Sequence, residues 1–308
     1  MGMLDNARRG PKTGGEVVRG HIVKAAGGAD AYVFSYRHLE VHAYVLPEPV
    51  PHVLYCTYGK SHVESSQPSA GTQTELTLRV PGTPALPDEW PARLLARAAR
   101  DDIEPGHYLV LDNPRGTLTG FVFVTDPILG VLDGPTGLIR FTYAVGINGD
   151  DVEQMLSWDP LKFAAFVGDR VPLGLTSTDR DPISANMQDR ALLEETVAAE
   201  GSSIGAMHAR YLEVDAAGRV DLDPEAARAL IRAARHRLLH GRSFALLNGE
   251  TWLLLNPHEP TTELAESHII VAATPALAHE LLATFDAVPG IYRLRTAPLE
   301  IRVVDPTT

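Results

Sequence analysis

The sequence predicts an α+β protein made of two mixed α/β domains, each a largely antiparallel sheet flanked by helices. Alternating strand patterns and amphipathic helix patterns follow one another in both halves of the 308-residue chain. A hydrophobic content of 44% is enough for one large or two ordinary cores. We expect a flexible N-terminal lead-in over residues 1–29, a first domain over 30–182 and a second over 183–308.

The first domain begins with a segment whose structure the pattern leaves open. Residues 31–46 alternate between apolar and polar and fit a strand or a short helix, which Pro47 ends. Residues 75–80 predict a strand, and Asp88 with Pro91 predicts the start of an amphipathic helix. The other elements expected here are strands at 107–111, 120–125 and 137–147 and a helix at 159–166.

The second domain carries the strongest helix signal. Asp223 is a typical N-cap with Pro224 in the first turn, and apolar residues at helical spacing continue to Leu238. Asn248-Gly249 between two β-rich runs predicts a two-residue hairpin. The other elements expected here are helices at 187–200 and 274–285 and strands at 207–214, 268–272 and 299–303.

Charge and cysteine content exclude several classes of protein. Twenty-seven Lys and Arg residues against thirty-nine Asp and Glu residues give a net charge of −12, so nucleic acid and membranes are not expected partners. The single cysteine, Cys56, excludes an intrachain disulfide and is typical of a reducing compartment. Because charges interrupt the first 20 residues, no signal peptide is expected and the predicted location is the cytoplasm.

A hydrolase motif is present only in part. Ser203 lies in a G-x-S-x-G pattern at 201–205, but a nucleophile elbow needs a strand before it and a helix after it. Here a predicted helix precedes the serine and a predicted strand follows it. An ordinary loop at a helix end is therefore favoured, and no catalytic residue is predicted.

Two histidine groups have spacings that a metal site can use. His38, Glu40 and His42 would share one face of a strand, although an exposed polar face explains them equally well. His236 and His240 lie four residues apart on a helix, but neither a general base nor a third ligand accompanies them. We predict neither a metal nor another cofactor.

The helix expected after Asp88 has a basic face. Arg93, Arg97 and Arg100 lie on the side opposite its apolar residues. Such a stripe can bind an acidic partner, but a solvated helix face is the simpler interpretation. The pattern alone therefore assigns no function to these arginines.

Several short sequence segments, in a fixed order, resemble the Suppressor of fused family over nearly all of the chain from about Gly28. In the first domain they are Tyr32-Val33-Phe34-Ser35-Tyr36-Arg37, residues 75–79 followed by Trp90-Pro91-Ala92, Gly106-His107, residues 125–137, and Val145-Gly146-Ile147. In the second they are Glu200-Gly201-Ser202 and residues 237–244. The resemblance implies a two-domain protein without catalysis. Animal members clamp an extended segment of a transcription factor between the domains, and bacterial members are inferred to neutralise toxins.

The resemblance also suggests where a partner would bind. Asp101 aligns with a partner-contacting tyrosine of the animal proteins, and Glu225 matches an acidic contact position. The expected partner-binding residues are Asp101 and His107 in the first domain and Glu225, His240, Arg242 and Phe244 in the second. For His240 and Phe244, a capping or core role is an equally good interpretation.

The combined reading is a cytoplasmic, non-catalytic protein-binding module. Its expected role is that of an immunity protein that neutralises a toxin of a bacterial polymorphic toxin system through an interdomain cleft. Because the chain is acidic, it would attract a basic partner. Two alternatives stay open. One is a regulatory adaptor that sequesters a transcription factor. The other is an enzyme, either a small hydrolase that uses Ser203 or a metal enzyme that uses His38, Glu40 and His42.

Overall fold

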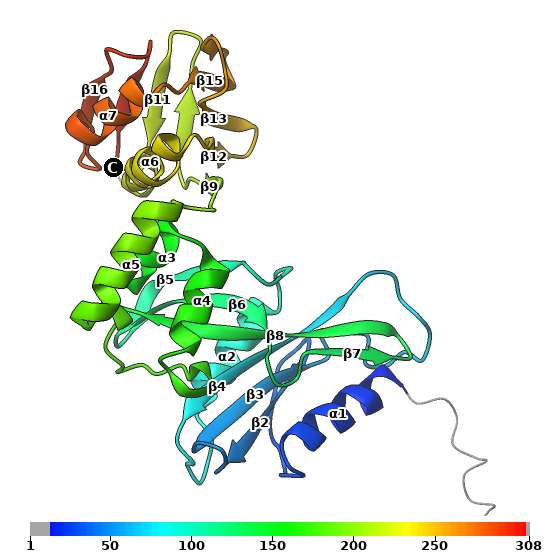
Figure 1. Ribbon diagram of the computed structural model, residues 1–308. Helices are drawn as coiled ribbons and strands as arrows, with labels where there is room; N and C mark the ends of the chain where they lie inside the picture. Colours follow the sequence, from blue (N-terminus) through cyan, green and yellow to red (C-terminus); the bar gives the residue numbers. More distant parts are fainter. Residues whose placement is uncertain (1–12, 306–308) are drawn as a thin grey trace, which may run out of the picture. The chain divides into compact units, whose positions relative to one another are not determined.

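The computed structural model describes residues 13–305, in which the chain divides into two units (Figure 1). Unit 1 contains the residues up to Val152 together with Pro160–Ala185. Unit 2 contains Glu153–Asp159 and the residues from Asn186 onward. Both units combine helices with sheets, so the predicted mixed α/β fold is confirmed. Within the described range, no helix has the length and apolar character needed to cross a membrane.

Unit 1 is built on an eight-stranded sheet with the order β1-β2-β3-β4-β8-β6-β5, in which β7 pairs with β8. Its pairings are antiparallel except between β4 and β8, which run parallel. The segment that fitted either a strand or a helix forms the first two strands. The strands are β1 (Tyr32–Ser35), β2 (Glu40–Leu46), β3 (His52–Tyr58), β4 (Gln73–Pro81), β5 (Tyr108–Arg115), β6 (Leu118–Thr125), β7 (Val131–Gly134) and β8 (Gly137–Asn148).

Helices cover both faces of this sheet. Helix α1 (Gly14–Ala25) packs with Leu54 and Cys56, whereas α2 (Glu89–Ala98) packs with Val53 and Tyr55. Because neighbouring residues of a strand point to opposite faces, α1 and α2 lie on opposite sides of β3. After β8, unit 1 also contains α4 (Pro160–Gly168) and the 3-10 turns Pro172–Gly174 and Ile183–Ala185, whereas most of α3 (Asp151–Ser157) belongs to unit 2.

Helix α1 corrects the expected flexible lead-in. Residues 1–12 lie outside the described range, but residues 14–25 are helical. Thr13 and Glu16 form a reciprocal capping box, and Val18 and Ile22 are fully buried four residues apart. The glycines signalled mobility in the sequence, yet Gly15 lies so near Tyr58 that a side chain at this position would collide with its hydroxyl.

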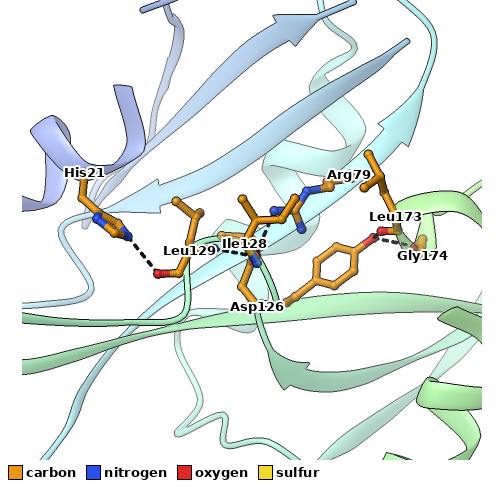
Figure 2. A network of polar contacts seen from close by, with 9 residues as sticks. His21, Arg79, Asp126, Ile128, Leu129, Leu173 and Gly174 are labelled. Carbon is orange, nitrogen blue, oxygen red and sulfur yellow. Dashed lines mark hydrogen bonds and ion pairs between the residues drawn. The ribbon is translucent and has the colours of Figure 1, made fainter. Parts of the chain in front are cut away.

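A buried ion pair ties the centre of this sheet to the loop after β6 (Figure 2). Arg79 of β4 donates to Asp126 at 2.9 Å, and the two side chains are 1% and 0% exposed. Asp126 also accepts from the Thr77 hydroxyl at 2.6 Å and from the backbone N–H groups of Ile128 and Leu129 at 2.9 and 3.0 Å. Burial by itself raises the pKa of Asp126, but the Arg79 charge and these hydrogen bonds outweigh it and hold the pKa below its usual value.

Unit 2 contains two mixed sheets rather than one largely antiparallel sheet. The strand orders are β10-β11-β17-β16 and β14-β15-β13-β12-β9, with parallel pairings between β11 and β17, β13 and β15, and β12 and β9. The strands are β9 (Ala206–His208), β10 (Leu212–Val214), β11 (Arg219–Leu222), β12 (Phe244–Asn248), β13 (Thr251–Asn256), β14 (Glu263–Leu264), β15 (His268–Ala272), β16 (Gly290–Arg293) and β17 (Glu300–Val303). The single strand expected at 207–214 is therefore two short strands in different sheets.

The helices of unit 2 follow the sequence signals closely. Helix α5 (Met187–Glu200) begins after the N-cap Asn186, and α7 (Pro275–Thr284) begins after Thr274. Helix α6 (Pro224–His236) is capped by Asp223, whose carboxylate accepts from the N–H groups of the first turn. The α-helix ends at His236, and a 3-10 turn, Leu238–His240, continues the chain. The hairpin of β12 and β13 forms as predicted, although its two loop residues are 249–250, one position later than expected.

Candidate partner-binding site

A groove in unit 1 lies between α2 and β5 and has a volume of about 730 Å³. Strand β5 is the terminal strand of the sheet in the described residues, so one of its edges has no neighbouring strand there. Two apolar side chains on this strand face solvent: Leu109 is 39% exposed and Val110 is 45% exposed. An open strand edge with exposed apolar side chains can add an extended peptide as a further strand.

The walls of this groove carry charges of both signs. On α2, Glu89 accepts from Arg93 at 2.8 Å, and both side chains are largely exposed. The guanidinium of Arg115, at the end of β5, lies 5.0 Å from the centre of the Trp90 ring and joins the strand to the start of α2. The groove therefore combines main-chain hydrogen-bonding groups, an apolar floor and a polar rim. This combination suits recognition of a polypeptide.

Of the residues predicted in the first domain, Asp101 lines this groove and His107 lies beside it. The Asp101 backbone carbonyl accepts from the Lys60 ammonium at 2.8 Å, which fixes the turn after α2. His107 is exposed in the residue before β5, and its Nδ1 accepts from the Glu104 N–H at 3.3 Å. The Nδ1 atom is thus an acceptor, which leaves Nε2 as the donor that this side chain can offer.

The residues predicted in the second domain do not form one cluster. Arg242 donates to the Ser202 carbonyl at 3.1 Å, and the His240 ring lies close to the neighbouring Gly201. Glu225 lies in the first turn of α6 and pairs with Arg228 at 2.7 Å. The part of α6 from Glu225 to His236 is about 16 Å long, and His240 lies in the 3-10 turn beyond its end.

Phe244 differs from the other candidates because it is 4% exposed and belongs to the core of unit 2. Its side chain therefore stabilises the β12–β13 sheet, in agreement with the core role that the sequence left open. Arg237, which the sequence did not single out, binds the loop after α5. It donates to the Ser202 carbonyl at 2.7 Å and to the Ser243 carbonyl at 2.6 Å.

The leads toward catalysis and metal binding do not converge. Ser203 follows α5 and precedes β9, so the strand, turn and helix of a nucleophile elbow are not formed around it. His42 and Glu40 pair with each other at 2.9 Å, whereas His38 bonds the Ala96 carbonyl at 3.1 Å. In residues 13–305, no group of three or more His, Cys, Asp or Glu side chains is placed to hold a metal ion.

The fold of the chain is similar to that of solved Suppressor of fused proteins. The crystal structure of Drosophila Suppressor of Fused aligns with a TM-score of 0.71 at 17% identity, over 96% of this chain and 98% of that one. The crystal structure of the Sufu-Fu complex aligns with a TM-score of 0.51 at 20% identity, over 61% of this chain and 97% of the matched one. The fold class is thus the two-domain Suppressor of fused fold.

A family model agrees with this result for the first unit. Residues 35–181 match the family model for the Suppressor of fused protein (SUFU), which covers nearly all of the sheet of unit 1. The resemblance predicted from the sequence is therefore confirmed, and this segment is a Suppressor of fused family domain. No curated protein matches the chain in sequence.

The most informative surface residues of the groove were missed in the sequence. Leu109 and Val110 were included in a predicted strand, but nothing in their pattern shows that this strand ends the sheet. Trp90 was recognised in a family phrase, although its contact with Arg115 depends on the tertiary fold. A detectable signal was the run of three adjacent apolar residues, 109–111, which departs from the alternation of a strand with one buried face.

Proposed function

We propose that this protein is a non-catalytic binding protein that holds an extended segment of a partner protein along the open edge of β5. The observation that carries this proposal is the terminal position of β5 in the described sheet, with the exposed side chains of Leu109 and Val110 beside the groove of α2. In native proteins, charges and prolines keep an edge strand from pairing with other chains, and in β5 these residue types are confined to its second half, from Asp112 to Arg115. The crystallised complex of Sufu with Fu supports a protein partner for this fold.

Main-chain hydrogen bonds from β5 would give affinity, and side chains at alternate positions of the partner would give specificity. Val110→Asp places a charge where the added strand would cover an apolar side chain. We expect it to weaken partner binding at least about tenfold, because an unpaired carboxylate would become desolvated.

The matched control is Val33→Asp on β1, the strand at the other end of the same sheet, because Val33 is 50% exposed. Titration calorimetry with a verified partner should show a loss of affinity for Val110→Asp but not for Val33→Asp. Hydrogen exchange should also slow in β5 when the partner is added. Equal affinities for both variants, or no slowing in β5, would assign the partner to another surface.

We further propose that the partner is a protein toxin that this chain neutralises, as the family resemblance implies for bacterial members. A net charge of −12 would attract a cationic target and raise the association rate. The test is a pull-down and an activity assay with the protein encoded by the neighbouring gene. A toxin that keeps its activity in the complex, or a neighbouring product that is a transcription regulator, would replace the immunity role with that of a regulatory adaptor.

In unit 2, Arg242 and Glu225 are proposed further contacts, because both are accessible and neither belongs to the core. Charge reversal at either residue should weaken partner binding by about 1 to 3 kcal/mol if the contact is desolvated. The melting temperature should change little, because surface substitutions usually alter stability by about 0.5 kcal/mol or less. Unchanged affinity in both variants would remove these two residues from the proposed interface.

A further inference from the structure

A second and smaller pocket of unit 1 lies between α2 and the turn that joins β1 to β2, with a volume of about 240 Å³. Four arginines line it: Arg37 comes from the turn, and Arg93, Arg97 and Arg100 come from α2 and the residues just after it. The stripe of three arginines seen in the sequence is thus completed by a fourth from a different element. This placement makes the stripe one wall of a concave basic site.

Hydrogen bonds hold the two walls of this pocket together. The His38 Nε2 lies 3.1 Å from the Ala96 carbonyl, which can only accept, so the imidazole donates to the last turn of α2. The Tyr36 N–H donates to the Leu39 carbonyl at 2.9 Å and closes the turn. The pocket is therefore formed without a ligand, which lowers the entropic cost of binding one.

The charge of this pocket is largely uncompensated. Arg93 pairs with Glu89 at the exposed surface, but within the described residues Arg37, Arg97 and Arg100 have no carboxylate partner. This concentration of positive charge occurs in a chain whose net charge is −12. Arg97 and Arg100 also suit the negative C-terminal end of α2, yet that explanation does not extend to Arg37.

An unpaired donor accompanies these arginines. The Tyr36 hydroxyl is buried and, in the described part of the chain, has no hydrogen-bond partner. Burial raises the pKa of Tyr36, and the nearby Glu89 acts in the same direction, so the phenol remains protonated and can donate. Because Tyr36 lines the pocket, a ligand oxygen that reaches this hydroxyl would supply the missing acceptor.

A phosphoryl group matches this set of donors better than a carboxylate does. Each guanidinium presents a planar fork that binds two oxygens, and a phosphoryl dianion has three terminal oxygens to share among several forks. A carboxylate would compensate only one of the uncompensated charges. Oxyanion recognition by clustered arginines is a general mode of reading phosphorylated proteins.

We propose that this arginine pocket binds a phosphoryl group carried by the partner polypeptide, so that phosphorylation of the partner strengthens its capture. The inference rests on the proposed function, because Arg93 and Arg97 line both this pocket and the groove beside β5. A segment lying along β5 can therefore present a phosphorylated side chain across α2.

The first test uses phenyl phosphate as the probe and acetate as its comparison, at constant ionic strength, with titration calorimetry. The double variant Arg37→Gln/Arg100→Gln alters residues that line the small pocket but not the groove, and it should weaken phenyl phosphate binding at least about tenfold. Tyr36→Phe should weaken it less. The exposed Arg295→Gln in unit 2 is the control and should leave it unchanged. Acetate binding as tight as phenyl phosphate, or an equal loss in the control, would overturn the proposal.

The second test asks where the phosphoryl group comes from. Phosphatase treatment of a verified partner should weaken its binding to the unmodified protein at least about tenfold and should have no effect on binding to Arg37→Gln/Arg100→Gln. Inorganic phosphate that binds the pocket while phosphatase treatment changes nothing would make free phosphate the ligand and overturn the partner-borne source. Val110→Asp should weaken partner binding without changing phenyl phosphate binding, so failure of the groove and failure of the pocket give different results.

Discussion

Replacement of Asp126 by asparagine should destabilise unit 1 by about 3 to 5 kcal/mol. The carboxylate is fully buried and lies 2.9 Å from an Arg79 guanidinium that is only 1% exposed. Two further nitrogens of Arg79, Nε and Nη1, are buried without a partner in residues 13–305, so the ion pair with Asp126 compensates most of this charge. Removing one member of a buried pair leaves the other as an uncompensated buried charge, and this is what makes the loss large.

Two further variants separate the contribution of the ion pair to this loss of stability from the contribution of the backbone hydrogen bonds. Asparagine keeps an oxygen that can accept from the N–H groups of Ile128 and Leu129, whereas Asp126→Ala loses these bonds as well and should cost more. Arg79→Met removes the buried cation, so Arg79→Met/Asp126→Asn should be more stable than the sum of the single changes predicts. We expect a coupling energy of about 2 to 3 kcal/mol in this double-mutant cycle.

Urea denaturation gives the free energy of unfolding for each variant, and amide hydrogen exchange locates the change. Faster exchange should occur in β4 and β8 of unit 1, while the strands of unit 2 serve as an internal control. A cost below about 1 kcal/mol for Asp126→Asn, or an additive cycle, would refute the argument that Arg79 depends on Asp126 for its charge balance.

The same carboxylate predicts a dependence on pH. Because the pKa of Asp126 is lower in the folded protein than its ordinary value of 3.8, its contribution to stability is fully present above 3.8. That contribution is lost as the pH falls through the lowered pKa. In Asp126→Asn this part of the acid sensitivity should be absent.

Three other changes test separate features of the fold. Phe244→Ala should cost about 3 to 5 kcal/mol in unfolding free energy without a specific loss of partner affinity, because Phe244 is a core residue. Gly116→Ala should lower stability far more than Gly130→Ala. Both glycines have positive φ, which costs an alanine about 1 kcal/mol, but only at Gly116 would a Cβ collide with the backbone, 2.0 Å from the Thr178 carbonyl oxygen. Comparing the thermal unfolding of the two variants separates the cost of the collision from the cost of the φ angle. Burial raises the pKa of Glu75 above its ordinary value of 4.5, although four hydrogen bonds to the carboxylate act in the opposite direction. Stability should therefore fall as the pH rises from 4.5 through the raised pKa. In urea denaturation at several pH values, Glu75→Gln should show a weaker dependence of stability on pH.

The sequence predicted individual helices and strands better than it predicted which strands pair with each other. Helix α6 was located from Asp223 and its apolar spacing, because capping and periodicity are local properties. The parallel pairing of β4 with β8 joins residues about 65 positions apart, and no local pattern encodes it. For the same reason the sequence predicted the strand that contains Val110 but not that the strand lies at the edge of the sheet. Arg79 was part of a predicted strand, but the sequence did not show that its charge is buried and balanced by Asp126, 47 residues further along the chain.

The length of the proposed added strand is limited by β5 itself. Its pairing with β6 is regular from Tyr108 to Val110 and then shifts register before Arg115, so the straight part of the open edge is short. A partner segment that pairs only with this part gains few main-chain hydrogen bonds, and each contributes about 1 kcal/mol. Main-chain pairing alone therefore cannot select one partner. Specificity must come from side chains in the groove of α2, where Trp90 and Arg115 are already held together and the arginine pocket adjoins.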